Sequence, residues 1–438
     1  MFEAKESVAV RFIDSQDQEQ VKAVFARSQM VSEEALASTQ AILEDVRIRG
    51  MDALYEYTKR FDGAKIIDEN FKVTPEEIRL AYEQVEEDVV VALTKARDQI
   101  ARYHERQKRP SSMETDELGC LTGQIIRPLR RVGCYVPGGT AAYPSSVLMT
   151  AVPAQVAGVE EIVMVSPPDE TGKMNPYTLV AADLAGVHEI YKVGGAQAVA
   201  ALAYGAGSLR PVDKIVGPGN VYVTMAKKLV YGTVDIDMLA GPSEILVLAD
   251  DTADASFVAA DLLSQAEHDR LSSAILLTNS MKLATAVKKE LPKQLAQLSR
   301  KEIAKASLEG QGAIIVTKDL PEAFDLANAF APEHLELAIE DPFGKLGLVK
   351  NAGAIFLGHY SPEPLGDYMA GPNHVLPTSG TARFYSPLNL DTYLKKMSLI
   401  SYTKEGLNAC GDAVVLLANK EGLEAHAASV AIRMKKEL

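Results

Sequence analysis

The chain has 438 residues, 47% hydrophobic and 24% charged, which is typical of globular proteins large enough for more than one domain. Its 45 Lys and Arg against 59 Asp and Glu give a formal charge of −14. So acidic a surface argues against nucleic acid or an anionic membrane as a partner. The N-terminus has no apolar core of secretory length, and the three cysteines form no Cys-x-x-Cys pair. These features predict a cytoplasmic protein without a disulfide framework.

The first part of the chain, residues 1–124, is predicted to be a helical region that packs on the domains that follow. Apolar residues recur at helical spacing through "SEEALASTQAILEDVRIRGMDALYEYTKRF". Another helix is expected to begin at "TPEE", where Thr74 can cap the helix and Pro75 takes the first helical position.

Residues 125–237 alternate short β-rich runs with helical segments. "RRVGCYVPGG", "EEIVMVSPP" and "EIYKVGG" each end a predicted strand near glycine or proline, a pattern typical of βαβ units and a parallel sheet. The turns "VGGAQA" and "KIVGPGN" precede helices whose N-termini can receive anions. No G-x-G-x-x-G sequence occurs, so the usual dinucleotide fingerprint is absent.

The same alternation restarts near residue 238 with "SEILVLAD", "SSAILLTNS" and "AGAIFLGHY", which predicts a second parallel sheet over 238–381. Residues 382–438 are too few and too polar to hold a large core alone. The predicted fold class is therefore α/β: two incomplete Rossmann-like parallel-sheet domains, with a small helical and extended C-terminal domain that packs on something else.

The stretch "LLSQAEHDR" places Gln265 and His268 one helical turn apart, on one face of a predicted helix. Such a pair can be a solvated helix end or half of a metal site. Zinc suits imidazole and carboxylate ligands where paired thiolates are absent. From the residues alone we predict zinc on His268 with one or two of Asp367, His374 and His426, and Gln265 beside the ligands.

Two further stretches carry candidate chemistry. In "APEHLEL", Glu333 beside His334 suits general acid–base work. The alternative is that Pro332 opens a helix with Glu333 in its first turn. In "LAGPSE", Ser243 can be a site residue or an ordinary helix cap. Cys134, between glycine and tyrosine, is interpreted as a packed apolar residue.

Eight motifs in this order resemble the histidinol dehydrogenase family over nearly the whole chain: "YVPGG", "VGGAQA", "VGPGN", "DMLAGPSEILVLAD", "LLSQAEHD", "PEHLE", "GDYMAGPNHVLPTSGTARF" and "EGLEAH". The resemblance implies oxidation of L-histidinol through L-histidinaldehyde to L-histidine, with two NAD+ and one zinc per subunit, in the last steps of histidine biosynthesis. It also implies an intertwined homodimer in which each active site is shared by both subunits.

The resemblance assigns roles residue by residue. It implies that Gln265 is itself a zinc ligand and not a residue beside the ligands. Glu333 and His334 would be the catalytic pair. Zinc would be held by Gln265, His268, Asp367 and His426, with His426 coming from the partner subunit. Substrate contacts would be Ser243, Gln265, His268, His334, Asp367, Glu421 and His426. NAD contacts would be Tyr135, Gln197 and Asn220.

Three alternatives remain at this stage. A relative with zinc and NAD could oxidise another polyol or a hydroxy-sulfonate, but Glu421 and His426, expected to grip an amino-imidazole, are both present. A non-catalytic zinc-binding or regulatory descendant would be expected to lack an acid–base residue or a ligand. An aldehyde dehydrogenase needs a cysteine nucleophile, and neither Cys134 nor Cys410 lies in a suitable motif.

Overall fold

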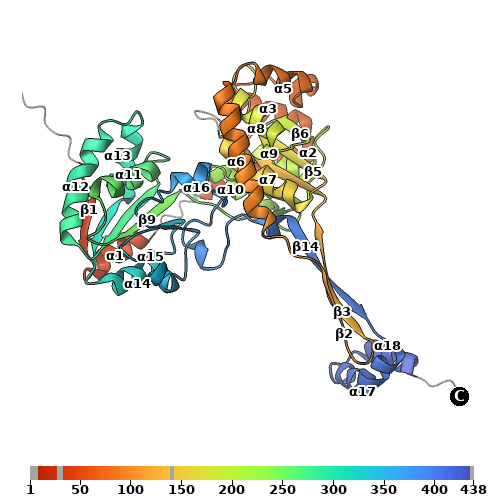
Figure 1. Cartoon of the computed structure of the whole chain (residues 1–438). Coiled ribbons are helices and arrows are strands. Elements are labelled where there is room, and N and C mark those ends of the chain that lie inside the picture. Colours follow the sequence, from red (N-terminus) through yellow and green to blue (C-terminus); the bar gives the residue numbers. More distant parts are fainter. Residues whose placement is uncertain (1–7, 27–32, 139–142, 435–438) are drawn as a thin grey trace, which may run out of the picture. The chain divides into compact units, whose positions relative to one another are not determined.

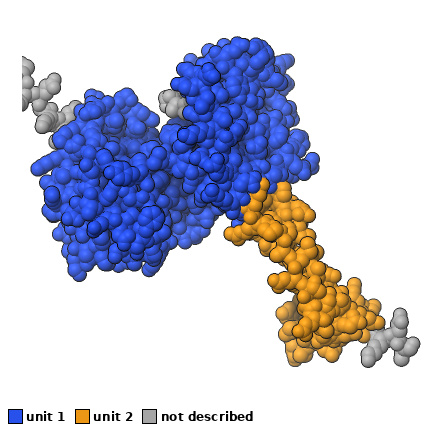
Figure 2. All heavy atoms as spheres, viewed as in Figure 1, with its two compact units in different colours: residues 1–107, 130–393 blue, residues 108–129, 394–438 orange. Residues whose placement is uncertain are grey.

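The structure is a computed structural model that describes residues 8–26, 33–138 and 143–434. The chain forms two compact units (Figure 2). Unit 1 comprises Met1–Gln107 and Arg130–Tyr393, and unit 2 comprises Lys108–Leu129 and Leu394–Leu438. Among the helices in the described ranges, none has the length and hydropathy needed to cross a membrane.

Sheet A of unit 1 is parallel throughout, with strand order β1-β11-β10-β9-β12-β13 (Figure 1). The strands are β1 (Arg11–Asp14), β9 (Glu244–Ala249), β10 (Ser273–Thr278), β11 (Ala313–Val316), β12 (His334–Ala338) and β13 (Ala354–Leu357). Every residue of β9 and β12 is buried, as expected for central strands of a parallel sheet with helices on both faces.

Two sets of helices cover the faces of sheet A. On one face, apolar side chains of the sheet pack with α11 (Ala255–Ala266), α12 (Met281–Leu295) and α13 (Lys301–Gln311). On the other face they pack with α1 (Gln18–Phe25) and α14 (Leu320–Phe330). The predicted second parallel-sheet domain is thereby confirmed in its fold class.

Sheet B of unit 1 is also parallel, with strand order β6-β5-β4-β7-β8. Its strands are β4 (Arg131–Tyr135), β5 (Glu161–Ser166), β6 (Glu189–Lys192), β7 (Lys214–Val216) and β8 (Asp235–Ile236). One face packs with α2 (Glu33–Arg49), α3 (Met51–Asp62), α4 (Asp68–Phe71), α9 (Gly195–Tyr204) and α10 (Val221–Val230). The other helices of this part are α5 (Pro75–Tyr82), α6 (Glu87–Glu105), α7 (Pro144–Ala157) and α8 (Pro176–Leu184).

The strand order reverses beside β4 in sheet B. The chain moves from β4 outward to β5 and β6, then returns to the other side of β4 to form β7 and β8. In open α/β sheets, a crevice for ligands lies outside the carboxyl ends of the strands at such a reversal. Sheet A reverses in the same way between β9 and β12.

Local signals in the N-terminal region agree with the structure in part. Thr74 caps α5, its hydroxyl accepting the Glu77 N–H at 3.3 Å, with Pro75 as the first helical residue. Residues 11–14, however, form β1, which pairs with β11 about 300 residues later. Four residues give no clear periodicity, and this strand was not expected in a region predicted to be helical.

Unit 2 combines an antiparallel sheet with two helices. The strands are β2 (Ser112–Thr115), β3 (Leu121–Pro128) and β14 (Leu394–Ser401), and the helices are α17 (Lys404–Lys420) and α18 (Glu424–Met434). The predicted small helical and extended C-terminal domain is thus joined by a hairpin from the middle of the chain. The four domain limits given by the sequence stay a prediction.

Candidate active site

Glu333 and His334 lie where β12 begins, at the amino end of sheet A. Each is only 5% exposed. Because α14 ends at Phe330 and β12 starts at His334, the alternative in which Pro332 opens a helix is wrong. The pair therefore stands at the start of a central buried strand.

The first residue of β9 holds both side chains. The Glu244 N–H donates to Glu333 Oε2 at 2.8 Å, and His334 Nδ1 lies 2.8 Å from the Glu244 carbonyl oxygen. Since a carbonyl can only accept, Nδ1 carries the hydrogen, which leaves the Nε2 lone pair free to take a proton. Neighbouring strand pairing thus sets the tautomer of His334.

Burial shifts the pKa of both side chains toward their neutral forms. It lowers the pKa of His334 to about 4, so the imidazole is neutral at pH 7. It raises the pKa of Glu333 well above the ordinary value for a glutamate, with the charges of Glu244 and Asp367 adding to the shift. An uncharged imidazole beside a carboxyl group of raised pKa is suited to proton transfer near neutral pH.

Backbone strain borders this pair. In the described chain, Ala331 (φ 48°) and Ser379 (φ 54°) are the non-glycine residues with positive φ. Ala331 ends α14 two residues before Glu333, and the Ser379 N–H donates to Glu244 Oε1 at 3.2 Å. Residues held in this region cost about 1–3 kcal/mol each and concentrate at functional sites.

His334 also belongs to a cluster of three side chains that can hold a metal ion. His334, Glu363 and Asp367 each offer a ligand atom, and these atoms lie within 4.8 Å of one another. Glu363 immediately precedes α16 (Pro364–Tyr368), and its Oε1 is 3.6 Å from His334 Nε2. Burial, then the charge of Asp367, raises the pKa of Glu363 to about 9. Glu363 was not predicted as a site residue from the sequence, although its i, i+4 spacing from Asp367 was a usable signal.

Gln265 and His268 lie at the end of α11, which runs back to the amino end of sheet A. Gln265 belongs to the last turn and is 1% exposed, and among the described residues its Oε1 has no hydrogen-bond partner. His268 lies two residues beyond the helix and is exposed. Its charge lowers the pKa of both His334 and His374, so it lies near the same group. A buried amide oxygen without a partner is the feature expected of a ligand awaiting a cation.

His374, considered above as a ligand, lies beside Asp367. Its Nδ1 is 3.6 Å from Asp367 Oδ1, and its Nε2 is 3.3 Å from the hydroxyl of Ser146. It is well placed to orient the Asp367 carboxylate.

The other predicted substrate contacts fall in different parts of the chain. Ser243, half-buried, directly precedes β9 and is next to the Glu244 that holds the acid–imidazole pair. Glu421, at the end of α17, and His426, in α18, are exposed residues of unit 2.

The predicted NAD contacts lie at the carboxyl end of sheet B. Tyr135 ends β4, and its hydroxyl accepts the Gly195 N–H at 3.0 Å. Gln197 is in the first turn of α9 and 1% exposed, with neither side-chain polar atom bonded to another described residue. Asn220 is exposed and caps α10. Tyr135 and the turn after β7 flank the reversal of strand order, where nucleotides bind in related folds.

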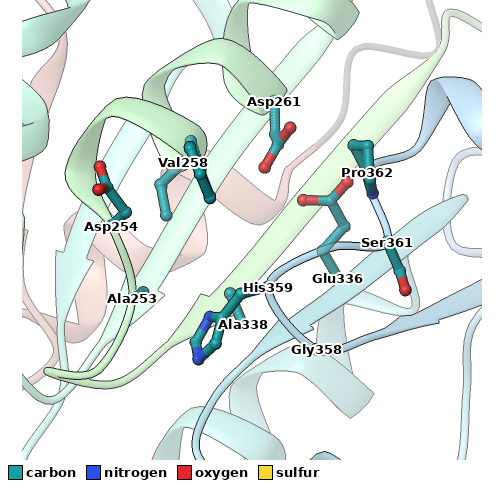
Figure 3. A pocket seen from close by; sticks show the side chains of 11 residues that line it. Ala253, Asp254, Val258, Asp261, Glu336, Ala338, Gly358, His359, Ser361 and Pro362 are labelled. Carbon is teal, nitrogen blue, oxygen red and sulfur yellow. The ribbon is translucent and has the colours of Figure 1, made fainter.

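Unit 1 also has two cavities that bear on the site. One of about 310 Å³, large enough for a small ligand, is lined mostly by apolar side chains of α6 and α7 and reaches Asp367. The other, toward the carboxyl end of sheet A, has about 10 Å³, room for roughly one water. In Figure 3 the carboxyl groups of Asp261 and Glu336 point toward one another in this small cavity. Burial raises the pKa of Asp261 to about 6.

These observations define a class of protein: an α/β enzyme with an acid–base pair and a candidate metal group at the amino end of one sheet, and glycine turns at the carboxyl end of the other. The comparisons give the particular family. The family profile described as histidinol dehydrogenase matches residues 25–434. The chain belongs to the histidinol dehydrogenase family and is an oxidoreductase.

Individual relatives agree over nearly their full length. The chain is 60% identical to histidinol dehydrogenase of Heliobacterium mobile over 395 residues, covering 90% of this chain and 92% of that protein. It is 57% identical to the enzyme of Moorella thermoacetica over 417 residues, covering 95% and 98%. The crystal structure of histidinol dehydrogenase from Elizabethkingia anophelis is 39% identical, with a TM-score of 0.93 and coverage of 97% and 98%.

Proposed function

We propose that the protein oxidises L-histidinol through L-histidinaldehyde to L-histidine with two NAD+, as the last steps of histidine biosynthesis. The observation that carries this proposal is the neutral His334, whose Nδ1–H is fixed on the Glu244 carbonyl while Nε2 is free to accept a proton. An alcohol carbon releases hydride as its oxygen loses a proton, so a neutral base of this kind is what the first oxidation requires.

In the first half-reaction His334 Nε2 takes the hydroxyl proton while the carbinol carbon gives its hydride to NAD+. The imidazolium then lies beside the carboxyl group of Glu363, 3.6 Å from Nε2. The positive charge of the imidazolium favours ionisation of this carboxyl group, whose pKa is otherwise raised to about 9, and the resulting carboxylate stabilises the imidazolium.

In the second half-reaction the aldehyde adds water before a second hydride leaves. Glu333 acts here in its ionised form, and its raised pKa makes that carboxylate a stronger base: it takes a proton from the water as the water oxygen attacks the carbonyl carbon, giving a hydrated aldehyde. The raised pKa of Glu333 allows it to return the proton afterwards. The hydrated aldehyde then gives a hydride to the second NAD+ while one hydroxyl proton passes to the same acid–base pair, and the carboxylic acid so formed releases its proton to give the carboxylate of histidine.

The ligands proposed for zinc are Gln265, His268, Asp367 and the partner subunit's His426. Amide, imidazole and carboxylate donors fit this metal, and the unpartnered Gln265 Oε1 supports its inclusion. A metal here would anchor the imidazole and amino group of the substrate and orient its hydroxymethyl carbon. His334, Glu363 and Asp367 form the competing ligand group, with Asp367 common to both.

The nucleotide is proposed to bind along Tyr135, Gln197 and Asn220, at the carboxyl end of sheet B. The free amide of Gln197 and the N-terminus of α10 offer polar groups to it. Ser243 and Glu421 would complete the contacts to the substrate.

A homodimer that shares its active sites is proposed from the character of unit 2. Few of its described side chains are buried, whereas several large apolar ones are exposed. These are Met113, Leu118, Met397, Ile400, Tyr402, Val414, Leu416, Leu417, Leu423 and Ile432. Exposed apolar surface of this kind is typical of a protein–protein interface. A second copy of the chain would bury it and would bring His426 and Glu421 of the partner subunit to the site.

The test is the number of NADH formed per L-histidinol consumed, measured on the purified protein, after chelation, and after zinc is restored. The proposal expects two NADH per substrate, lost on chelation and regained with zinc. If histidinol is inert while another polyol or a hydroxy-sulfonate yields NADH, the proposal is wrong and the related oxidoreductase considered above takes its place.

A further inference from the structure

A buried ion pair joins two segments at the carboxyl end of sheet B. We propose that Lys227 and Asp237 are positioning residues that hold the turn 217–220 in the conformation that binds the nucleotide. The inference rests on the proposed function, because that function assigns the turn to NAD+.

The two charged side chains are almost fully withdrawn from water. Lys227 lies in α10 and its side chain is 3% exposed; Asp237 follows β8 and its side chain is 1% exposed. Lys227 Nζ donates directly to Asp237 Oδ1. Thr224, one turn earlier on α10, donates to the Ala240 carbonyl at 3.1 Å, so the same helix face holds the chain on both sides of residue 238.

Both halves of the ion pair bind the same glycine. Lys227 Nζ donates to the Gly217 carbonyl oxygen at 2.9 Å, and the Gly217 N–H donates to Asp237 Oδ2 at 2.7 Å. The peptide groups on either side of one α-carbon are therefore held by opposite charges. This arrangement fixes the direction in which the chain leaves β7.

Gly217 could not take this conformation as another residue. Its φ is +113°, and a Cβ added there would lie 2.2 Å from the carbonyl oxygen of Tyr135 at the end of β4. The turn is thus pressed against the strand that carries the proposed nucleotide contact, at the reversal of strand order. Three residues further on, Asn220 caps α10.

An ion pair is an expensive way to stabilise a core, since apolar residues of similar volume often do as well. In some proteins, however, buried charged or polar groups specify direction and register in a way that apolar packing does not. At a turn whose backbone groups must face a ligand, that specificity has a use. We therefore expect the loss of the pair to affect nucleotide binding even where stability is kept.

The experiment compares two double variants of the full-length, zinc-loaded protein. Lys227→Met/Asp237→Asn removes both charges together, so that neither is left buried alone, while the Asn oxygen can still accept the Gly217 N–H. Lys214→Met/Asp235→Asn is the matched control, because this second Lys–Asp pair (2.8 Å) lies at the amino end of β7, away from the turn. The probe is NADH, titrated calorimetrically, and steady-state kinetics and thermal unfolding accompany it.

The inference expects about a tenfold weaker NADH affinity and a similar rise in KM for NAD+ in the first variant. It expects kcat and KM for histidinol to stay within about twofold of the parent, and the control to bind NADH normally. Unchanged NADH affinity in the first variant would overturn it. So would a parallel fall of kcat, both KM values and stability, or an equal effect of the control, since each indicates a general structural role.

The calorimetric readout separates this inference from the proposed reaction. If the parent protein binds NADH but does not oxidise histidinol, the reaction is wrong and the ion pair can still be tested. A parent protein that binds no NADH would overturn the inference as well.

Discussion

The two parallel sheets of unit 1 share an architecture but use opposite ends. In sheet B the glycine turns and proposed nucleotide contacts follow the carboxyl ends of β4, β6 and β7. In sheet A the acid–imidazole pair stands at the amino end of β12, while the carboxyl end has a cavity of only about 10 Å³. On the proposed assignment, the rule that places ligands at the carboxyl ends of parallel strands holds for sheet B and not for sheet A.

The difference has a structural basis. The chain passes from β8 of sheet B to β9 of sheet A in the few residues 237–243, leaving a carboxyl end and entering an amino end. The proposed cofactor site at the first end and the proposed substrate site at the second are thus connected by residues 237–243. Proposed cofactor contacts and an acid–base pair can therefore lie on two similar sheets, because residues 237–243 join the carboxyl end of sheet B directly to the amino end of sheet A.

The largest effect is expected from His334→Asn, which tests whether the acid–base chemistry at the amino end of sheet A is separate from nucleotide binding at sheet B. Asparagine can keep a donor to the Glu244 carbonyl, but it has no group in place of the Nε2 lone pair. Because a general base typically contributes 10²- to 10⁴-fold, we expect kcat to fall by about 10³-fold while NADH affinity is unchanged. Steady-state kinetics and NADH titration measure the two effects. His188→Asn is the control, since His188 Nδ1 only accepts the Ile162 N–H in sheet B. A kcat within threefold of the parent would remove His334 from the chemistry.

Gln265→Leu tests whether the amino end of sheet A also holds the metal ion. Gln265 Oε1 has no hydrogen-bond partner among the described residues, and a buried polar atom left without one is destabilising, so its removal should raise the free energy of unfolding by about 1 kcal/mol in the metal-free protein. If Oε1 is a metal ligand, zinc affinity should fall at least about tenfold. Denaturant unfolding and competition with a zinc-binding dye measure the two. Ser272→Ala removes a buried hydroxyl that likewise has no partner among the described residues, and it should affect stability alone. Equal zinc affinity in both variants would exclude Gln265 as a ligand.

Tyr135→Phe addresses the carboxyl end of sheet B. It removes the acceptor of the Gly195 N–H, a loss of about 1 kcal/mol. We expect KM for NAD+ to rise about fivefold and kcat to change less than twofold. Tyr191→Phe, which removes a hydrogen bond to the Ser208 carbonyl elsewhere in sheet B, should leave KM for NAD+ unaltered. A larger loss in kcat than in KM would contradict the assignment of this end to the cofactor.

The smallest effect concerns Asp62, at the end of α3, whose charge influences the pKa of the Tyr135 hydroxyl. Burial raises the pKa of Asp62 from 3.8 to about 6. Between these values the folded protein holds a proton that the unfolded chain has lost, so stability decreases as the pH rises through this window. Asp62→Asn should therefore gain about 1 kcal/mol relative to the parent between pH 4 and pH 8, after allowance for its partial exposure.

Urea unfolding at several pH values measures this gain, and Asp52→Asn, an exposed site on α3, controls for the loss of one negative charge. The same pH profile for parent and Asp62→Asn would show that this carboxyl group titrates normally.

The elements that could be predicted are those with local signals. Buried runs such as "EILVLA" and the glycine turns indicated two parallel sheets, and Thr74-Pro75 marked the start of α5. The pairing of β1 with β11 and of β3 with β14 could not be predicted, because each partner lies far away in the sequence and each strand is short or mixed in character.

At the site, the adjacency of Glu333 and His334 was visible, whereas their surroundings were not. Their hydrogen bonds run to the backbone of Glu244, about 90 residues earlier, which no local pattern reveals. Glu363 was missed because a glutamate between two prolines resembles an exposed turn, although the fold buries it to 2% exposure. The end of sheet A that carries the candidate site could have been predicted from the sequence. A helix that follows a strand runs antiparallel to it, so α11 brings Gln265 back to the amino end of the sheet.

The most direct test of this division is a zinc-edge anomalous difference map from crystals of the zinc-loaded protein soaked with NADH. The account predicts one metal peak in contact with Gln265 Oε1, His268 and Asp367, and nucleotide density over Tyr135 and the turn 217–220. A peak held by His334, Glu363 and Asp367 instead, or nucleotide density at the carboxyl end of sheet A, would contradict it.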